Sequence, residues 1–372
     1  MPLRETIDRY LDTVQGASPA RGFVPLQGRF LWVMLDVAER CNLECSHCAL
    51  VGWRNEMEAN EIISEEMIGR IDREVLPYTS RATLSTFHEP LVAPSRLFML
   101  LEACRRRQVS FVDMTTNGLL LTEKVARDLM VSGINLINFS VDGASEQTYQ
   151  HVRVGGTFAQ FKEKLELAVR IRREMGAREK VRFRFTCCMM RSNVHEAEDL
   201  VRLAIENEID WVELRIAMKA DNVPMATDEL LCFCPERADE AFAKARALAD
   251  RHGLRLDVPP SSEEIRASNR PRPRYTNCMY PWYNAVITAK GEIFSCCMWH
   301  GSDRLEEMRS QPFEKAWNGD AFRRLRREME TGTLSRKGCQ DCAVHFNMAD
   351  PRYWKTYEFI RGEDMLGGSG PA

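Results

Sequence analysis

Three cysteines lie close together near the start of the chain. Cys41, Cys45 and Cys48 form the pattern C-x3-C-x2-C within eight residues. Cysteine thiolates bind zinc ions and iron–sulfur clusters, and a cluster of four irons normally takes four of them. Three thiolates would leave one iron open to a further ligand. His47 offers zinc a fourth ligand instead, although neighbouring side chains rarely converge on one ion.

Four more cysteines have the spacing of a second metal site, C-x12-G-x4-C followed by C-x2-C. They are Cys278, Cys296, Cys339 and Cys342. Gly291 favours a hairpin turn that would bring the two ends of the first motif together. Zinc is the alternative to an iron–sulfur cluster at this site. Cys297 is the alternative to Cys296 as a ligand.

Composition and charge exclude several classes of protein. Of the 372 residues, 44% are hydrophobic and 28% charged, and the net charge is −3. These values are typical of a globular protein and give no sign of a nucleic-acid or membrane-surface partner. Apolar runs such as 30–35 are far shorter than the roughly 20 residues of a membrane span. The odd number of cysteines, 13, without a secretory signal argues against disulfides and for a reducing cytoplasm.

Strand-like and helix-like segments alternate from about residue 30 to residue 216. The expected strands are 30–36, 82–87, 110–114, 135–141, 181–190 and 211–216. Helical patterns lie between them, at about 64–76, 94–107, 121–132, 157–175 and 194–207. This alternation predicts an α/β fold with a parallel sheet, whose chemistry lies at the C-terminal ends of the strands.

The rest of the chain divides around this α/β unit. The expected segments are an N-terminal extension (1–29), the α/β unit (30–220), a connector with one helix at about 236–252 (221–276), a second cysteine-containing unit (277–347) and a tail (348–372). The second unit is expected to hold a hairpin, 285–288 with 292–296, and a helix over 312–330.

After the first strand, the chain resembles the radical S-adenosylmethionine (radical SAM) superfamily, whose signature is the same C-x3-C-x2-C pattern. Three later segments match the family: Ser-Thr-Phe-His-Glu-Pro at 85–90, Thr-Asn-Gly at 116–118, and Ser-Val-Asp-Gly at 140–143. The second cysteine group resembles the SPASM/twitch appendage of these enzymes. No cysteine follows Cys342, which indicates one auxiliary cluster, as in the shorter twitch form.

The resemblance implies a partial (β/α)6 TIM-like barrel with a small C-terminal α+β SPASM/twitch domain. It also implies two [4Fe–4S] clusters, S-adenosylmethionine, and a flavodoxin- or ferredoxin-like electron donor. The open iron would pass an electron to S-adenosylmethionine, and the 5′-deoxyadenosyl radical would abstract a hydrogen atom from the substrate. The residues implied in cofactor binding are Phe87, His88, Glu89, Asn117, Ser140, Asp142 and Arg153.

One of the remaining cysteines has an argument for chemistry. Cys187 and Cys188 are consecutive in an expected strand, so they point to opposite faces. Cys187 falls on the wholly apolar face, whereas Cys188 shares its face with Arg184 and Thr186 and would point toward the active side. A thiol there is a candidate hydrogen-atom donor to a substrate radical. Simple packing is the alternative.

Three functions follow from this pattern. The first is an enzyme that abstracts hydrogen from a polar small molecule, such as a sugar, aminocyclitol or nucleoside, and ends in epimerisation or dehydrogenation. The second is a maturase that modifies a ribosomally synthesised precursor peptide. The third is a non-catalytic iron–sulfur electron-transfer protein, which a first site with only three thiols disfavours.

Overall fold

The computed structural model describes residues 24–336 and Cys339, with gaps at residues 25, 49, 86 and 279. Longer gaps are 52–60, 218–222, 260–277, 298–303 and 337–338. The predicted ligand Cys342, and most of the expected terminal extensions, lie outside the described residues.

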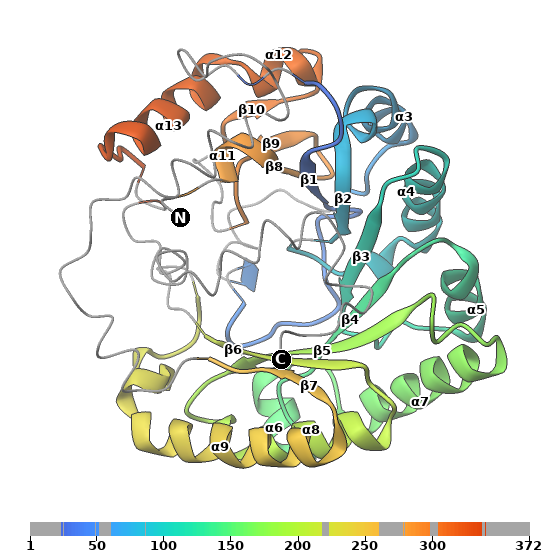
Figure 1. The fold of residues 1–372 in the computed structure, drawn as a ribbon, viewed down its shortest axis with the longest axis vertical. Coiled ribbons are helices and arrows are strands. Elements are labelled where there is room, and N and C mark those ends of the chain that lie inside the picture. Colours follow the sequence, from blue (N-terminus) through green and yellow to red (C-terminus); the bar gives the residue numbers. More distant parts are fainter. Residues whose placement is uncertain are drawn as a thin grey trace.

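Ten strands form a single sheet in the order β10-β9-β8-β1-β2-β3-β4-β5-β6-β7. The strands are β1 (Leu31–Leu35), β2 (Thr79–Leu84), β3 (Phe111–Thr116), β4 (Leu136–Ser140), β5 (Arg182–Met189), β6 (Trp211–Ile216), β7 (Arg255–Asp257), β8 (Asn284–Ile287), β9 (Glu292–Phe294) and β10 (Glu306–Glu307). All pairs from β8 through β1 to β7 are parallel. Figure 1 shows the parallel strands curving around the middle of the molecule. The predicted α/β fold with a partial barrel is confirmed.

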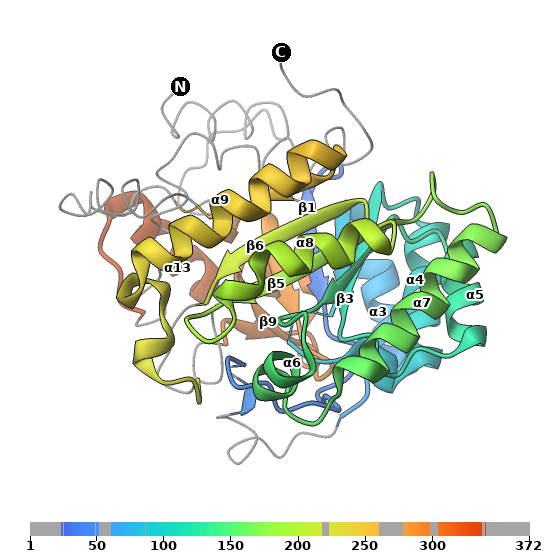
Figure 2. The same ribbon diagram turned by 90° about the horizontal axis from the view of Figure 1, so that it is seen from below.

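Helices cover the outer face of this curved sheet (Figures 1 and 2). They are α3 (Glu65–Glu74), α4 (Pro94–Arg106), α5 (Glu123–Val131), α6 (Glu146–Val152), α7 (Phe158–Glu174), α8 (Ala197–Glu206) and α9 (Pro235–His252). Ser64, Thr122 and Thr157 precede α3, α5 and α7, and each side chain accepts a hydrogen bond from a backbone N–H in the first turn. Such caps satisfy amide groups that have no partner within the helix, so they fix where these helices begin.

Two elements differ from the sequence-based expectation. β2 begins and ends earlier than the predicted 82–87, because Ser85 adopts a left-handed backbone with φ 82° that ends the strand. The predicted helix 312–330 is two helices, α12 (Phe313–Trp317) and α13 (Asp320–Thr331), separated by Asn318 and Gly319. The short elements α6, β7 and β10 were not predicted.

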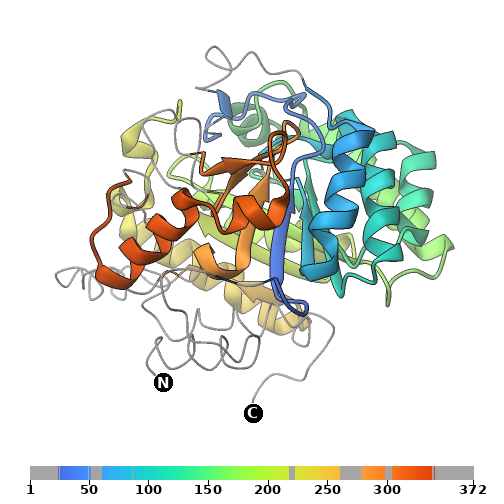
Figure 3. The same cartoon turned by 90° about the horizontal axis from the view of Figure 1, so that it is seen from above.

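The C-terminal hairpin extends the sheet of the barrel. β8 pairs in parallel with β1, and β9 returns antiparallel to β8. Gly291 forms the predicted turn, with φ 82° and its N–H donating to the carbonyl of Thr288 at 2.8 Å. Figure 3 shows α12 and α13 on the side of the molecule where this hairpin meets β1. The second cysteine region is therefore anchored directly on the first strand.

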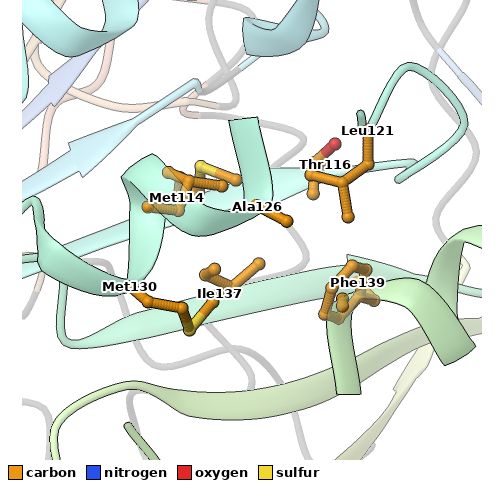
Figure 4. A pocket seen from close by; sticks show the side chains of 9 residues that line it. Met114, Thr116, Leu121, Ala126, Met130, Ile137 and Phe139 are labelled. Atoms are coloured by element: carbon orange, nitrogen blue, oxygen red, sulfur yellow. The ribbon is translucent and has the colours of Figure 1, made fainter. Parts of the chain in front are cut away.

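A narrow apolar gap lies on the helix side of β3 and β4 (Figure 4). It is lined by Met114, Thr116, Leu121, Ala126, Leu129, Met130, Ile137, Phe139 and Ala168. The gap has no room for a water molecule and exposes no polar atom, so it belongs to the core. Within the described ranges, no helix combines the length and apolar character that crossing a membrane requires.

Candidate active site

The first cysteine group lies in the loop that follows β1, and this loop is hydrogen-bonded to the end of α6. The N–H of Glu44 donates to the carbonyl of Val154 at 2.8 Å, and the N–H of Ser46 donates to that of Val152 at 2.9 Å. Gly155, with φ 97°, passes close to the loop, and a Cβ there would meet the Asn42 carbonyl at 3.5 Å. Two segments about a hundred residues apart in sequence therefore hold the cysteine loop in place.

The three thiols of this loop influence one another electrostatically. Cys45 is buried, and Cys41 and Cys48 are partly buried. Burial raises the pKa of Cys45 to about 12 and also raises the pKa of Cys41. Among the described residues, no three Cys, His, Asp or Glu side chains converge closely enough to hold a metal ion. The donor set, three thiols on one loop, suits a cluster with one open iron, and the ligand roles remain predictions.

The His47 side chain faces the carboxylate of Asp142. Its Nε2 lies 3.7 Å from Asp142 Oδ2. Burial lowers the pKa of His47, while Asp142 acts in the opposite direction. The neutral imidazole is therefore the favoured form at neutral pH.

Glu89 connects the loop after β2 to the end of β3. Its Oε1 accepts hydrogen bonds from Thr116 Oγ1 at 2.6 Å and from the Leu91 N–H at 3.1 Å, and its Oε2 accepts from the Asn117 N–H at 2.7 Å. Only 3% of the residue is exposed, and burial raises its pKa. The carboxylate thus positions Asn117 at the C-terminal end of the sheet.

Asn117 in turn contacts the cysteine loop. Its Nδ2 donates to Asn42 Oδ1 at 2.9 Å and lies 3.8 Å from the Cys41 sulfur. The neighbouring loop after β2 is held by Asp36, which accepts from the Phe87 N–H at 3.1 Å and lies 3.5 Å from His88 Nδ1. Asp36 is fully buried. It was not predicted as a site residue, although a single carboxylate ending an apolar strand was a usable signal.

Asp142 contacts both Cys188 and Arg153 on the opposite side of the loop. One oxygen accepts a hydrogen bond from the Cys188 N–H at 2.6 Å, and the other lies 2.6 Å from Arg153 Nη2. Burial opposes the charge on Arg153, but Asp142 and Cys45 act in the other direction and raise its pKa. Ser140, the last residue of β4, pairs in register with Thr186 and is only partly buried. The predicted cofactor residues Asp142 and Arg153 therefore lie near Cys45.

Cys188 and Cys187 lie on opposite faces of β5, as the alternation predicts. Cys187 is fully buried in the main core beneath the helices. Cys188 is partly buried on the other face and packs against Val152 and Met190 of a separate small cluster. Burial raises the pKa of Cys188, Asp142 raises it further, and the thiol is close enough to Cys45 for their charges to interact. The structure thus places Cys188 on the inner face of the sheet, within electrostatic range of Cys45.

A network of charged side chains lies on the inner face of the sheet. Arg81 on β2 pairs with Asp113 on β3 through two contacts of 3.1 Å. Arg184 on β5 lies 3.0 Å from Glu213 on β6, and Arg215 donates to the same Glu213 oxygen at 2.9 Å. Arg81, Asp113 and Arg184 were not proposed as site residues, although charged residues within apolar strands were a signal for them.

Tyr280 and Tyr283 lie near two cysteines of the second group, Cys278 and Cys296. Cys296 and Cys339 are buried, and Cys278 is partly buried. Burial raises the pKa of Tyr283, and the nearby Cys278 and Cys296 raise it further. A hydrogen bond with Cys296 lowers the pKa of Cys297. Cys278 and Cys296 are thus near one another, as their spacing predicts.

Comparisons with known families agree with this arrangement. The sequence model of the radical SAM superfamily matches residues 35–204, which hold the first cysteine group and β2 to β5. The model of the SPASM iron–sulfur cluster-binding domain matches residues 278–343, which hold all four cysteines of the second group. Together they imply S-adenosylmethionine and two [4Fe–4S] clusters as cofactors.

Curated relatives match parts of the chain. A probable GTP 3′,8-cyclase of Methanococcus maripaludis is 32% identical over 137 residues, which are 37% of this chain and 45% of the relative. The chain thus spans less than half of that relative's length. The GTP 3′,8-cyclase of Clostridium perfringens is 22% identical over 286 residues, which are 75% of this chain and 84% of the relative.

Solved structures share the fold at low sequence identity. Streptococcus suis SuiB bound to S-adenosylmethionine has a TM-score of 0.65 and 15% sequence identity to this chain. The match covers 92% of this chain and 75% of the SuiB chain. The anSMEcpe structure with bound AdoMet has a TM-score of 0.60 and 15% identity, and covers 90% of this chain and 98% of its own. The chain belongs to the radical SAM superfamily and carries a C-terminal SPASM iron–sulfur cluster-binding domain.

Proposed function

We propose that this enzyme removes a hydrogen atom from a carbon of a polar small molecule and that Cys188 returns a hydrogen atom to that carbon. The substrate is of the sugar, aminocyclitol or nucleoside type, and the outcome is epimerisation. When bound, S-adenosylmethionine and the first cluster supply the 5′-deoxyadenosyl radical that begins the reaction. Cys41, Cys45 and Cys48 would hold that cluster, and Arg153 is the candidate partner of the S-adenosylmethionine carboxylate.

The position of Cys188 is the observation that carries this proposal. Its backbone N–H is fixed by Asp142 at 2.6 Å, and its side chain lies on the inner face of β5 near Cys45. A hydrogen-atom donor must hold its proton until it reacts. Burial keeps the thiol protonated by raising its pKa, which suits this role.

Hydrogen transfer breaks the S–H bond of Cys188 and forms a C–H bond at the substrate radical, which leaves a sulfur radical. That radical regains one proton from solvent and one electron from a flavodoxin- or ferredoxin-like donor. Dehydrogenation, the alternative, would need no hydrogen donor at Cys188.

Solvent deuterium tests the proposal. In D2O the thiol carries deuterium, so the holoenzyme should place one deuterium into its product when incubated with a panel of sugars, aminocyclitols and nucleosides, measured by mass spectrometry. The GTP 3′,8-cyclase relatives support including nucleotides in the panel. Cys188→Ala should still form 5′-deoxyadenosine but lose the labelled epimer. Cys187→Ala is the matched control, because its side chain lies on the other face of the same strand.

Two results would contradict the proposal. The first is full turnover with deuterium incorporation by Cys188→Ala. The second is modification of a precursor peptide with no change in any small molecule of the panel, which would favour a maturase.

A further inference from the structure

One ionic network on the inner face of the sheet, on strands β2, β3, β5, β6 and β7, contains more positive than negative charge. Within the described residues, this network pairs four arginines with three carboxylates. These are Arg81, Arg184, Arg215 and Arg255, against Asp113, Glu213 and Asp257. Arg215 and Arg255 are about half exposed, so the excess positive charge of this network is accessible to an anion.

Arg215 shares its carboxylate partner with a second cation. Its Nη2 donates to Glu213 Oε2 at 2.9 Å, but Arg184 Nη1 lies 3.0 Å from that same oxygen. The side chain of Arg184 is 6% exposed and that of Arg215 is 55% exposed. One carboxylate oxygen is therefore shared by two guanidinium groups, and the accessible one keeps free donors, since a guanidinium has five.

Arg215 also stands beside the proposed hydrogen donor. Cys188 and Arg215 are register partners on the adjacent parallel strands β5 and β6. Side chains paired in this way point to the same face of the sheet, and neighbouring strands are about 4.8 Å apart. A substrate whose reacting carbon lies at Cys188 is thus within reach of the Arg215 guanidinium.

Buried polar atoms without hydrogen-bond partners line the same face. Among the described residues, these include Arg184 Nε, Asn138 Oδ1 and Thr186 Oγ1. Asn138 is fully buried, and Arg184 is its register partner on β5. Buried polar groups are nearly always hydrogen-bonded in native proteins, so this set indicates a polar ligand in the barrel.

We propose that the substrate carries an oxyanion, either a carboxylate or a phosphate ester, which Arg215 binds beside Cys188. The guanidinium fork matches the two oxygens of such a group, and one negative charge balances the network. Hydroxyl or amine groups of the same substrate would satisfy Asn138, Thr186 and Arg184. The inference rests on the proposed function for the identity of the reacting carbon, but anion binding at Arg215 is measured separately from hydrogen transfer.

Arginine modification of the holoenzyme tests this site directly. Phenylglyoxal is reacted with the protein, and modification of Arg215 is measured by peptide mass spectrometry in sodium chloride, acetate or inorganic phosphate at equal ionic strength. Arg178 is the internal control, because its side chain is also 55% exposed but lies on the surface near Glu208. Acetate or phosphate should slow the reaction at Arg215 by about three-fold or more relative to Arg178, since an anion occupies the fork.

Each outcome has a defined meaning. Protection by acetate identifies a carboxylate site, and protection by phosphate alone identifies a phosphate-ester site. Equal slowing at both arginines, no slowing, or an Arg215 that does not react even in chloride would overturn the proposal. Glu213→Gln removes the carboxylate that competes for Arg215, so a lower concentration of acetate or phosphate should protect Arg215 from phenylglyoxal. If a higher concentration were needed, the proposal would also be overturned. Protection of Arg215 together with an unlabelled product in D2O would retain the anion site and reject the reaction at Cys188.

Discussion

Replacing Glu213 by Gln probes the charged network of the barrel most directly. Glu213 lies between two guanidinium groups, Arg184 at 3.0 Å and Arg215 at 2.9 Å, and its side chain is 20% exposed. The amide of glutamine is nearly isosteric but neutral. The substitution therefore removes the negative charge and leaves the buried Arg184 without its ion-pair partner.

The magnitude follows from the pKa of Glu213. Burial opposes ionisation, but Arg184 and Arg215 lower the pKa from an ordinary 4.5 to about 2. At about 1.36 kcal/mol per pH unit, this difference corresponds to roughly 3 kcal/mol of folding stability at pH 7. A carboxylate with a lowered pKa stabilises the fold above its unfolded pKa and loses that contribution as the pH falls toward its folded pKa. The stability difference between wild type and Glu213→Gln should therefore narrow as the pH decreases from 7 to 4.

Urea unfolding of the cluster-loaded protein, followed by tryptophan fluorescence, measures this difference. Glu198→Gln is the control, because its surface pair with Arg202 has side chains 34% and 51% exposed. Such a pair contributes less than about 1 kcal/mol. A Glu213→Gln variant no less stable than the control would refute the electrostatic role of Glu213. A difference that widened toward pH 4 would show that the sign of the pKa shift is wrong.

Three further substitutions or treatments test the surroundings of the cysteine loop. Gly143→Ala should lower the free energy of unfolding by about 1–3 kcal/mol in the same assay, since the added Cβ would lie 2.6 Å from the Tyr149 amide nitrogen. Gly69→Ala, inside a helix, is the control and should not lower the free energy of unfolding. Asn117→Ala should release iron faster to a chelator, because it removes the contact with Asn42. In cluster-free protein at pH 8, iodoacetamide should label exposed Cys232 before Cys45, whose pKa burial raises to about 12, as peptide mass spectrometry would report.

Local patterns in the sequence were sufficient for the fold class and for the kind of chemistry. The strand 211–216 was predicted with its observed ends, and the helix expected at 236–252 begins one residue earlier. The spacing of Cys41, Cys45 and Cys48 indicated a cluster with an open iron. Period-two alternation separated Cys187 from Cys188, because successive residues of a strand face opposite sides. Each of these inferences depends on residues that are close in sequence.

Long-range partners were decided by the tertiary structure alone. The sequence did not indicate that Asp142 would contact both Arg153 and Cys188, or that the second cysteine region would extend the sheet at β1. The sharing of one Glu213 oxygen by Arg184 and Arg215 depends on the pairing of β5 with β6. Contact energies between strands depend on register, which is set by packing of the whole sheet. The cysteine spacing therefore indicated the kind of chemistry, whereas the assembled barrel decided which side chains share its inner face.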